Sequence, residues 1–216
     1  MALTLNVNAS SPEDAPLVLA AEVVQAGGII VYPTETLYGI GANALSPQTV
    51  ARVQEIKGRT SAKPILVLVP DIEHLQPIVE GIPSVARRLI GNFWPGPLTL
   101  IFKATAAVPA ELNLASGTIG VRVPSSPLCR RLLLLADCPM TSTSANRTGE
   151  PDFRSVSDIR GALGTAIDLY LDAGVLPATK PSSIVDVTGT TARLVREGAI
   201  SLAQLREVVP DLTSAS

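Results

Sequence analysis

Uninterrupted apolar runs alternate with amphipathic stretches along most of the chain. The runs 29–32, 65–69 and 98–102 are rich in β-branched residues and leucine, which is typical of strands covered on both faces. Elsewhere, apolar residues recur at helical spacing, as at Val53 and Ile56. The alternation of the two patterns predicts an α/β protein.

Capping residues and turns place the other elements. Ser11 and Pro12 have the form of a helix start, and we expect helices over 11–26, 46–56, 71–78, 83–93, 126–136, 156–163 and 202–209. Further strands are expected at 118–124, 168–172, 182–187 and 192–198. The last two are joined by a Thr-Gly-Thr-Thr turn that predicts a hairpin. The expected fold is therefore a twisted mixed β-sheet flanked by helices, with residues 33–43 forming a polar loop.

Composition limits the function classes. The chain has 216 residues and a formal net charge of −2, which predicts one domain (1–216, core about 12–209) without an overall basic field for a nucleic acid. Cys129 and Cys138 lie outside any CxxC pattern, and His74 is the only histidine, so neither a metal framework nor a catalytic triad is expected. The chain shows no leader and no apolar run of membrane-spanning length, so we expect a cytoplasmic protein.

Three polar features are candidates for chemistry. Lys57, Arg59 and Lys63 precede the apolar run 65–69, where they could be a solvated loop or one wall of an anion site. Arg122 lies inside an apolar strand, so it either reaches solvent or pairs with an anion such as a carboxylate. Hydroxyl-rich stretches at 33–43 and 139–149 could be tight connections or ligand-binding walls. The residues alone leave these alternatives open.

Taken together, six segments resemble the YrdC-type family of L-threonylcarbamoyladenylate synthases, in its short single-domain bacterial form, from about residue 12 to 200. These segments are 33–43, Lys57-Gly58-Arg59, 118–124, Ser144-Ala145-Asn146, 182–186 and 195–198. The resemblance implies a YrdC-like fold with a basic concave cavity. It also implies a reaction in which L-threonine, bicarbonate and ATP give threonylcarbamoyl-AMP and pyrophosphate, with Mg²⁺ accompanying ATP. The product would pass to a tRNA threonylcarbamoyl transferase complex, which modifies tRNA beside the anticodon.

The resemblance also assigns site residues. It implies a catalytic role for Lys57, Arg59, Ser144 and Asn146. It implies ATP binding by Arg59, Lys63, Thr118, Ser144, Asp152 and Arg196, and threonine binding by Thr36, Arg122, Ser142 and Ser182, with no metal held by protein ligands alone. Asp152 and Leu68 depart from the usual residues of the family at their positions.

Two alternatives compete with the synthase. One is a YciO-like paralogue without synthase activity, but members of that branch tend to lose the Lys-x-Arg and Ser-x-Asn pairs, and both pairs are present here. The other is a double-stranded RNA-binding module. A net charge of −2 without a basic tail predicts at most weak RNA binding.

Overall fold

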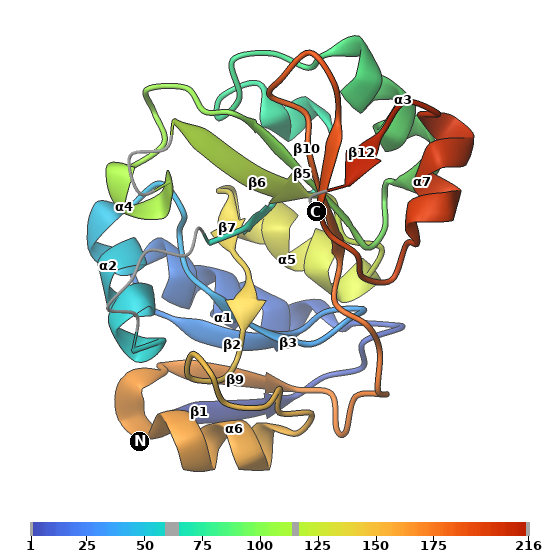
Figure 1. Cartoon of the computed structure of the whole chain (residues 1–216). Coiled ribbons are helices and arrows are strands. Elements are labelled where there is room, and N and C mark those ends of the chain that lie inside the picture. Colours follow the sequence, from blue (N-terminus) through green and yellow to red (C-terminus); the bar gives the residue numbers. More distant parts are fainter. Residues whose placement is uncertain (1, 59–64, 114–116, 215–216) are drawn as a thin grey trace.

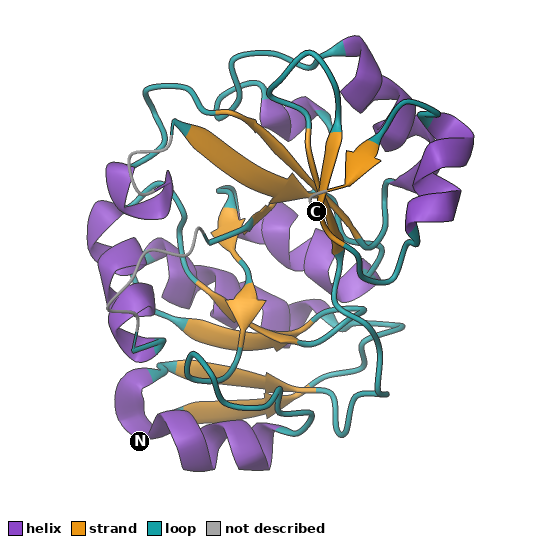
Figure 2. Cartoon of the chain, viewed as in Figure 1, coloured by secondary structure: helices purple, strands orange, loops and turns teal. Residues whose placement is uncertain are grey.

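The computed structural model describes residues 2–58, 65–113 and 117–214. Its strands form two mixed sheets with helices packed against them, one sheet in the lower half of Figure 1 and the other in the upper half. Figure 2 shows helices and strands interleaved along the whole chain. The predicted mixed α/β class is confirmed, and the strands divide between two sheets instead of forming one.

The first sheet has five strands in the order β1-β9-β2-β3-β8. Their bounds are β1 (Leu3–Asn6), β9 (Leu169–Asp172), β2 (Ile30–Pro33), β3 (Tyr38–Gly41) and β8 (Thr143–Ser144). β1, β9 and β2 run parallel, and β3 is antiparallel to both β2 and β8. Every residue of β2 is buried, which explains its continuous apolar sequence.

β3 was not expected, because the sequence analysis treats residues 33–43 as a loop. Its two glycines weaken the strand signal, since glycine has a low β-propensity. Here glycine is needed for packing against Tyr32. A Cβ atom on Gly41 would lie 2.6 Å from Cε1 of Tyr32 and 2.8 Å from Cε of Met140. The strand is thus specified by close approach to an aromatic ring, which local sequence does not reveal.

The second sheet has seven strands in the order β12-β11-β10-β5-β6-β4-β7. Their bounds are β12 (Thr213–Ser214), β11 (Arg193–Arg196), β10 (Ser183–Asp186), β5 (Leu98–Lys103), β6 (Thr118–Arg122), β4 (Val67–Leu68) and β7 (Met140–Thr141). β10 is antiparallel to β11 and parallel to β5, which confirms the predicted hairpin within a mixed sheet.

One segment crosses from the second sheet to the first. β7 pairs with β4 in the seven-stranded sheet, and β8 pairs with β3 in the five-stranded sheet. Only Ser142 separates these two strands. The crossing places the hydroxyl-rich stretch of the sequence where the two sheets meet, between the two halves of Figure 1.

Helices cover both sheets. They are α1 (Asp14–Gln25), α2 (Pro47–Ile56), α3 (Ser84–Phe93), α4 (Ala110–Asn113), α5 (Pro127–Ala136), α6 (Val156–Leu163) and α7 (Leu202–Val208), with 3₁₀ turns at η1 (Glu73–Leu75) and η2 (Gly164–Ala166). Ser46, Ser126, Ser155 and Ser201 cap α2, α5, α6 and α7 through their side chains.

Two helix predictions are corrected. The first helix begins at Asp14 rather than Ser11, because the backbone N–H groups of Ser10 and Ser11 donate to the Asn8 side chain and form a turn. The helix expected at 71–78 is only the η1 turn. Pro77 has no N–H group to continue the hydrogen-bond ladder, so the segment cannot extend into a regular helix.

The apolar interior forms two clusters. The larger one joins residues of both sheets, such as Val31 of β2 and Val121 of β6, which are fully buried. The smaller one lies where α1 and α5 pack together and includes Tyr32, Leu68 and Met140. No helix within the described part of the chain is long and apolar enough to cross a membrane.

Candidate functional site

A cavity of about 420 Å³ lies where the two sheets meet. Its wall combines hydroxyl groups, two arginines and one carboxylate. The residues that line it are Thr34, Thr36, Leu37, Tyr38, Gly39, Leu66, Arg122, Ser142, Thr143, Ser144, Asp152, Pro181, Ser182, Ile184 and Arg196. They come from seven separate stretches of the chain, so the tertiary fold alone brings them together.

The turn between β2 and β3 supplies one side of the cavity. The Thr34 hydroxyl accepts hydrogen bonds from the backbone N–H groups of Thr36 and Leu37, each at 3.1 Å. The two threonine hydroxyls lie 3.0 Å apart. The Thr179 hydroxyl donates to the Thr36 carbonyl at 2.6 Å. The Thr34 hydroxyl also donates to the Leu37 carbonyl at 2.7 Å, so its hydrogen-bonding capacity is used within the turn. This network fixes the Thr36 hydroxyl at the wall.

Arg122 ends β6 and enters the cavity from the second sheet. Its side chain is only 3% exposed, and Nη1 lies 2.6 Å from Oε1 of Glu35. A buried guanidinium needs such a partner because an isolated charge is costly to desolvate. Both the solvent-exposed position that the sequence left open for Arg122 and an unpaired buried position are therefore excluded.

A second arginine lies on β11. Arg196 donates through Nε and Nη2 to the Ser182 carbonyl at 3.2 Å and 2.8 Å. The Ser182 hydroxyl is in turn 3.0 Å from the Thr99 hydroxyl on β5. Burial lowers the pKa of Arg196, with nearby Asp152 opposing and nearby Arg122 reinforcing that direction. Arg122 and Arg196 line the same cavity.

Lys57, Ser144 and Asn146 form one hydrogen-bonded group, which we call the Lys57 cluster. Lys57, at the end of α2, donates through Nζ to the Ser144 carbonyl at 2.6 Å and to Oδ1 of Asn146 at 2.7 Å. The Ser144 hydroxyl donates to the same Oδ1 at 2.7 Å. Asn146 Nδ2 reaches Oδ1 of Asp152 at 3.3 Å. The two sequence signatures therefore meet in space.

The structure brings most of the predicted site residues together. Seven of them line the cavity: Thr36, Arg122, Ser142, Ser144, Asp152, Ser182 and Arg196. Lys57 and Asn146 are buried and do not line the cavity, but they contact Ser144, which does. Thr118 begins β6, at the opposite end of that strand from Arg122, and does not line the cavity. Arg59 and Lys63 lie outside the described residues.

Sequence reasoning missed several members of the wall. Thr34 and Thr143 belong to the two hydroxyl-rich stretches but were not singled out, although hydroxyl residues alternate around Thr34 and run without a break around Thr143. Glu35, which does not line the cavity but pairs with Arg122, was also missed, because it lies in the turn between β2 and β3 and nothing local connects it to a residue of the other sheet. Leu68, where the resemblance raised a departure from the family, is fully buried in the smaller apolar cluster.

Two titratable groups lie close to the Arg122–Glu35 pair. Burial raises the pKa of the Tyr32 phenol strongly above its ordinary value, and the same effect raises the pKa of the Cys129 thiol to about 12. Both therefore remain protonated at neutral pH and are poor candidates for a base or a nucleophile.

The carboxylate content of the site bears on metal binding. In the part of the chain that the structure describes, no group of three or more His, Cys, Asp or Glu side chains could hold a metal ion. Asp152 is the only acid among the residues that line the cavity. A divalent cation could thus be held here only with oxygens from a ligand or from water completing its shell.

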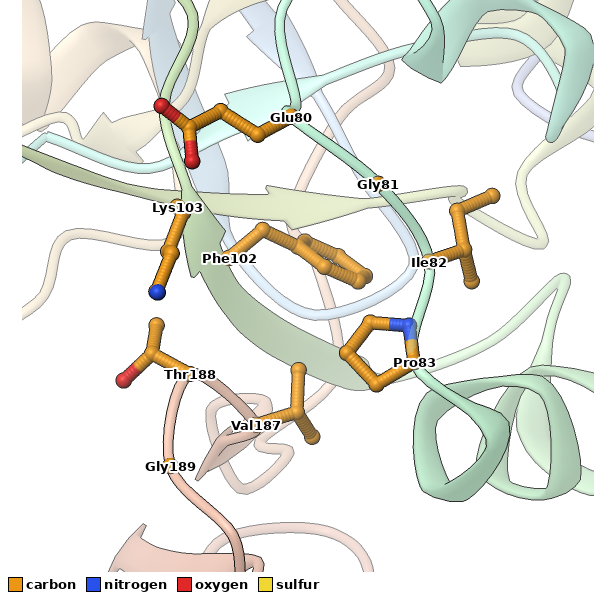
Figure 3. Close-up of a pocket in the computed structure, with 9 residues that line it drawn as sticks. All are labelled: Glu80, Gly81, Ile82, Pro83, Phe102, Lys103, Val187, Thr188 and Gly189. Carbon is orange, nitrogen blue, oxygen red and sulfur yellow. The ribbon is translucent and has the colours of Figure 1, made fainter.

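A second cavity, of about 410 Å³, lies at the ends of β5 and β10 (Figure 3). Phe102 and Val187 form part of its apolar lining, and Glu80 and Lys103 contribute charged side chains. None of the predicted site residues lines it. The cavity at the junction of the sheets is therefore the better candidate for the active site.

Comparison with known proteins agrees with this choice. The Sua5/YciO/YrdC family model, described as "Telomere recombination", matches residues 22–198. The chain belongs to this family. A threonylcarbamoyl-AMP synthase of Pyrococcus abyssi is 31% identical over 98% of this chain, which spans 62% of that relative's length. A putative threonylcarbamoyl-AMP synthase of Mycobacterium tuberculosis is 37% identical, over 89% of this chain and 88% of its own.

Solved structures of the family share the fold. The crystal structure of P. abyssi Sua5 complexed with L-threonine superposes with a TM-score of 0.94 at 30% identity, over 99% of this chain and 62% of that one. The crystal structure of Escherichia coli YciO gives a TM-score of 0.86 at 30% identity, over 95% of this chain and all of that one. The Sua5/YciO fold includes both sheets described above.

Proposed function

We propose that this protein is an L-threonylcarbamoyladenylate synthase, a nucleotidyltransferase that converts L-threonine, bicarbonate and ATP into threonylcarbamoyl-AMP and pyrophosphate. The observation that carries the proposal is the junction cavity, where the buried Arg122, the more exposed Arg196 and the Lys57 cluster converge with a row of hydroxyl groups. Curated relatives named threonylcarbamoyl-AMP synthase, among them one from Bacillus subtilis, support the same activity.

In this proposal the threonine carboxylate binds at Arg122. The guanidinium has more donors than its single contact with Glu35 uses, and a carboxylate is its natural partner. The hydroxyls of Thr36, Ser142 and Ser182 surround the same region and can accept or donate hydrogen bonds to the ammonium, carbamate and side-chain hydroxyl groups. A hydroxylated amino acid therefore suits this wall better than an apolar one.

The nucleotide binds toward Arg196, Ser144 and Asp152 in the proposal. Arg196 supplies charge for phosphate oxygens, and Asp152 could accept a hydrogen bond from the ribose or contribute one oxygen to Mg²⁺. Mg²⁺ would accompany ATP and neutralise phosphate charge. Arg59, Lys63 and Thr118 remain predicted ATP ligands from the sequence resemblance.

The chemistry requires positioning more than a strong base. The threonine amine combines with bicarbonate, with loss of water, to give N-carboxythreonine. Its carboxylate oxygen is already a nucleophile and attacks the α-phosphorus of ATP while pyrophosphate leaves. Catalysis then depends on holding the two reactants in line and stabilising the charge on the transferring phosphoryl group. The Lys57 cluster fixes Ser144 at the wall between the two substrates, and Arg122 and Arg196 hold the two anions.

Further parts of the proposal follow from the activity. The product is consumed by a tRNA threonylcarbamoyl transferase complex, and the protein works in the cytoplasm as one structural unit with a basic concave cavity. Its direct affinity for RNA is weak, because the formal net charge is −2.

The test is release of pyrophosphate by purified protein with ATP, Mg²⁺, bicarbonate and L-threonine. We expect pyrophosphate only when threonine and bicarbonate are both present, with L-valine as the matched control because it replaces the hydroxyl by a methyl group. Pyrophosphate release that is independent of threonine, or its absence in the complete mixture, contradicts the proposal.

A further inference from the structure

Glu35 lies between two residues of the cavity wall but does not belong to the wall itself. Thr34 and Thr36 line the cavity, whereas the Glu35 carboxylate turns to Arg122, with Oε1 2.6 Å from Nη1. The same Oε1 accepts a hydrogen bond from the backbone N–H of Ser125 at 3.4 Å. Glu35 is thus held by Arg122 and by the Ser125 backbone, and it is not among the residues that line the cavity.

The pair is buried and only partly hydrogen-bonded. The Arg122 and Glu35 side chains are 3% and 17% exposed. Nε of Arg122 and Oε2 of Glu35 are buried without a hydrogen-bond partner among the described residues. A bidentate arginine–carboxylate pair would use two N–H groups, but a single contact joins these two charges. Glu35 therefore offsets the charge of Arg122, while the Nε–H group of Arg122 remains available as a donor.

A fixed negative charge beside Arg122 changes which anions the cavity prefers. Among the described residues that line the cavity, the charged ones are Arg122, Arg196 and Asp152, so without Glu35 two arginines would face one acid. The electrostatic energy of a ligand grows in proportion to its charge. One buried carboxylate thus weakens the binding of a multiply charged anion more than the binding of a single carboxylate.

We propose that Glu35 is a specificity-determining residue, which offsets the charge of Arg122 so that this end of the cavity accepts a singly charged carboxylate and disfavours inorganic pyrophosphate or a misplaced triphosphate. The identity of the carboxylate as L-threonine rests on the proposed function. Glu35 would thereby keep the amino-acid end of the cavity clear of the anionic product and of the phosphates of ATP.

The experiment compares Glu35→Gln with wild type. Glutamine keeps the shape and an oxygen acceptor for Arg122 but removes the charge. Calorimetry measures the affinity for sodium pyrophosphate and for L-threonine separately. We expect pyrophosphate to bind the variant at least about tenfold more tightly, while threonine affinity changes less than about threefold. Glu22→Gln, the same change at an exposed position of α1, is the matched control and should alter neither affinity.

Equal pyrophosphate affinity in wild type and folded Glu35→Gln overturns the inference, and so does a variant that gains threonine affinity as much as pyrophosphate affinity. If the variant does not fold, competition in the wild-type protein decides. Threonine binding that persists with saturating pyrophosphate supports the inference, and direct displacement of threonine by pyrophosphate overturns it. Wild-type protein that binds no threonine contradicts the proposed function instead, and the pyrophosphate comparison still tests Glu35.

Discussion

Asn146→Ala removes the central acceptor of the Lys57 cluster. In the native protein, Oδ1 of Asn146 accepts from Lys57 Nζ and from the Ser144 hydroxyl, each at 2.7 Å. Its Nδ2 donates to the carbonyls of Glu150 and Pro151 at 2.7 Å and 3.2 Å. Asn146 is 5% exposed and Lys57 is 2% exposed, so water cannot easily replace these contacts.

The expected loss of stability is about 5 kcal/mol, since the hydrogen bond to the buried charge of Lys57 contributes about 1.5–3 kcal/mol and each of the three neutral ones about 1 kcal/mol. For a chain of this length, that corresponds to a fall in Tm of about 10–20 °C. Urea unfolding followed by circular dichroism measures the free energy of unfolding, and a thermal scan measures Tm. Synthase activity should fall with it, because Ser144 loses its hydrogen bond to Oδ1.

Asn92→Ala is the matched control for this experiment. Asn92 is exposed on α3, and its Nδ2 donates only to the Arg88 carbonyl at 2.8 Å. Its replacement should change stability by less than about 0.5 kcal/mol. If Asn146→Ala costs less than about 1 kcal/mol, the Lys57 cluster does not hold this part of the cavity together, and the reasoning is refuted.

Three other predictions concern single residues. The pKa of the Cys129 thiol is 9.0 when the chain is unfolded, and burial raises it to about 12 in the folded protein. Between these pH values only the unfolded state loses the proton, so the free energy of unfolding falls as pH rises above 9. Between pH 8 and 10, urea unfolding should show a fall in the free energy of unfolding that is about 1.4 kcal/mol larger in wild type than in Cys129→Ala. An equal fall in the two proteins would argue against a protonated buried thiol. Gly41→Ala should cost about 1–3 kcal/mol because its Cβ would collide with Tyr32, while Gly91→Ala, in open space on α3, should stabilise by up to about 1 kcal/mol. In Arg196→Lys, a single ammonium group cannot reproduce the contact that two guanidinium nitrogens make with the Ser182 carbonyl. We expect the KM for ATP to rise about tenfold and the KM for threonine to stay unchanged in steady-state kinetics. An equal rise in both KM values would show that Arg196 does not act on the nucleotide alone.

Local patterns in the sequence were enough to predict most elements. Serine caps and proline at the first turn mark α2 and α5, and β2 is recognisable from its continuous β-branched run. The errors lie where tertiary contacts override local preference. β3 exists because the ring of Tyr32 packs over its glycines, and no property of residues 38–41 alone indicates that contact.

The candidate site was only partly predictable for the same reason. The signature residues Ser144 and Asn146 were identified through a family resemblance, but their hydrogen bonds to Lys57 come from pairing between β3 and β8, which local sequence does not specify. The partner of Arg122 is Glu35, which lies 87 residues away in the sequence, in the turn between β2 and β3 of the other sheet. The division of the strands into two sheets was likewise not expected, because the five-residue run 140–144 carries a strand of each sheet.

The transfer of bicarbonate carbon into an adenylate tests the central claim most directly. Purified protein is incubated with ¹³C-bicarbonate, L-threonine, ATP and Mg²⁺, and the nucleotide products are measured at once by mass spectrometry. We expect a threonylcarbamoyl-AMP species that carries the ¹³C label and that disappears when threonine is omitted. A protein that consumes ATP without forming this labelled adenylate would contradict the assignment of the junction cavity to threonylcarbamoyl-AMP synthesis.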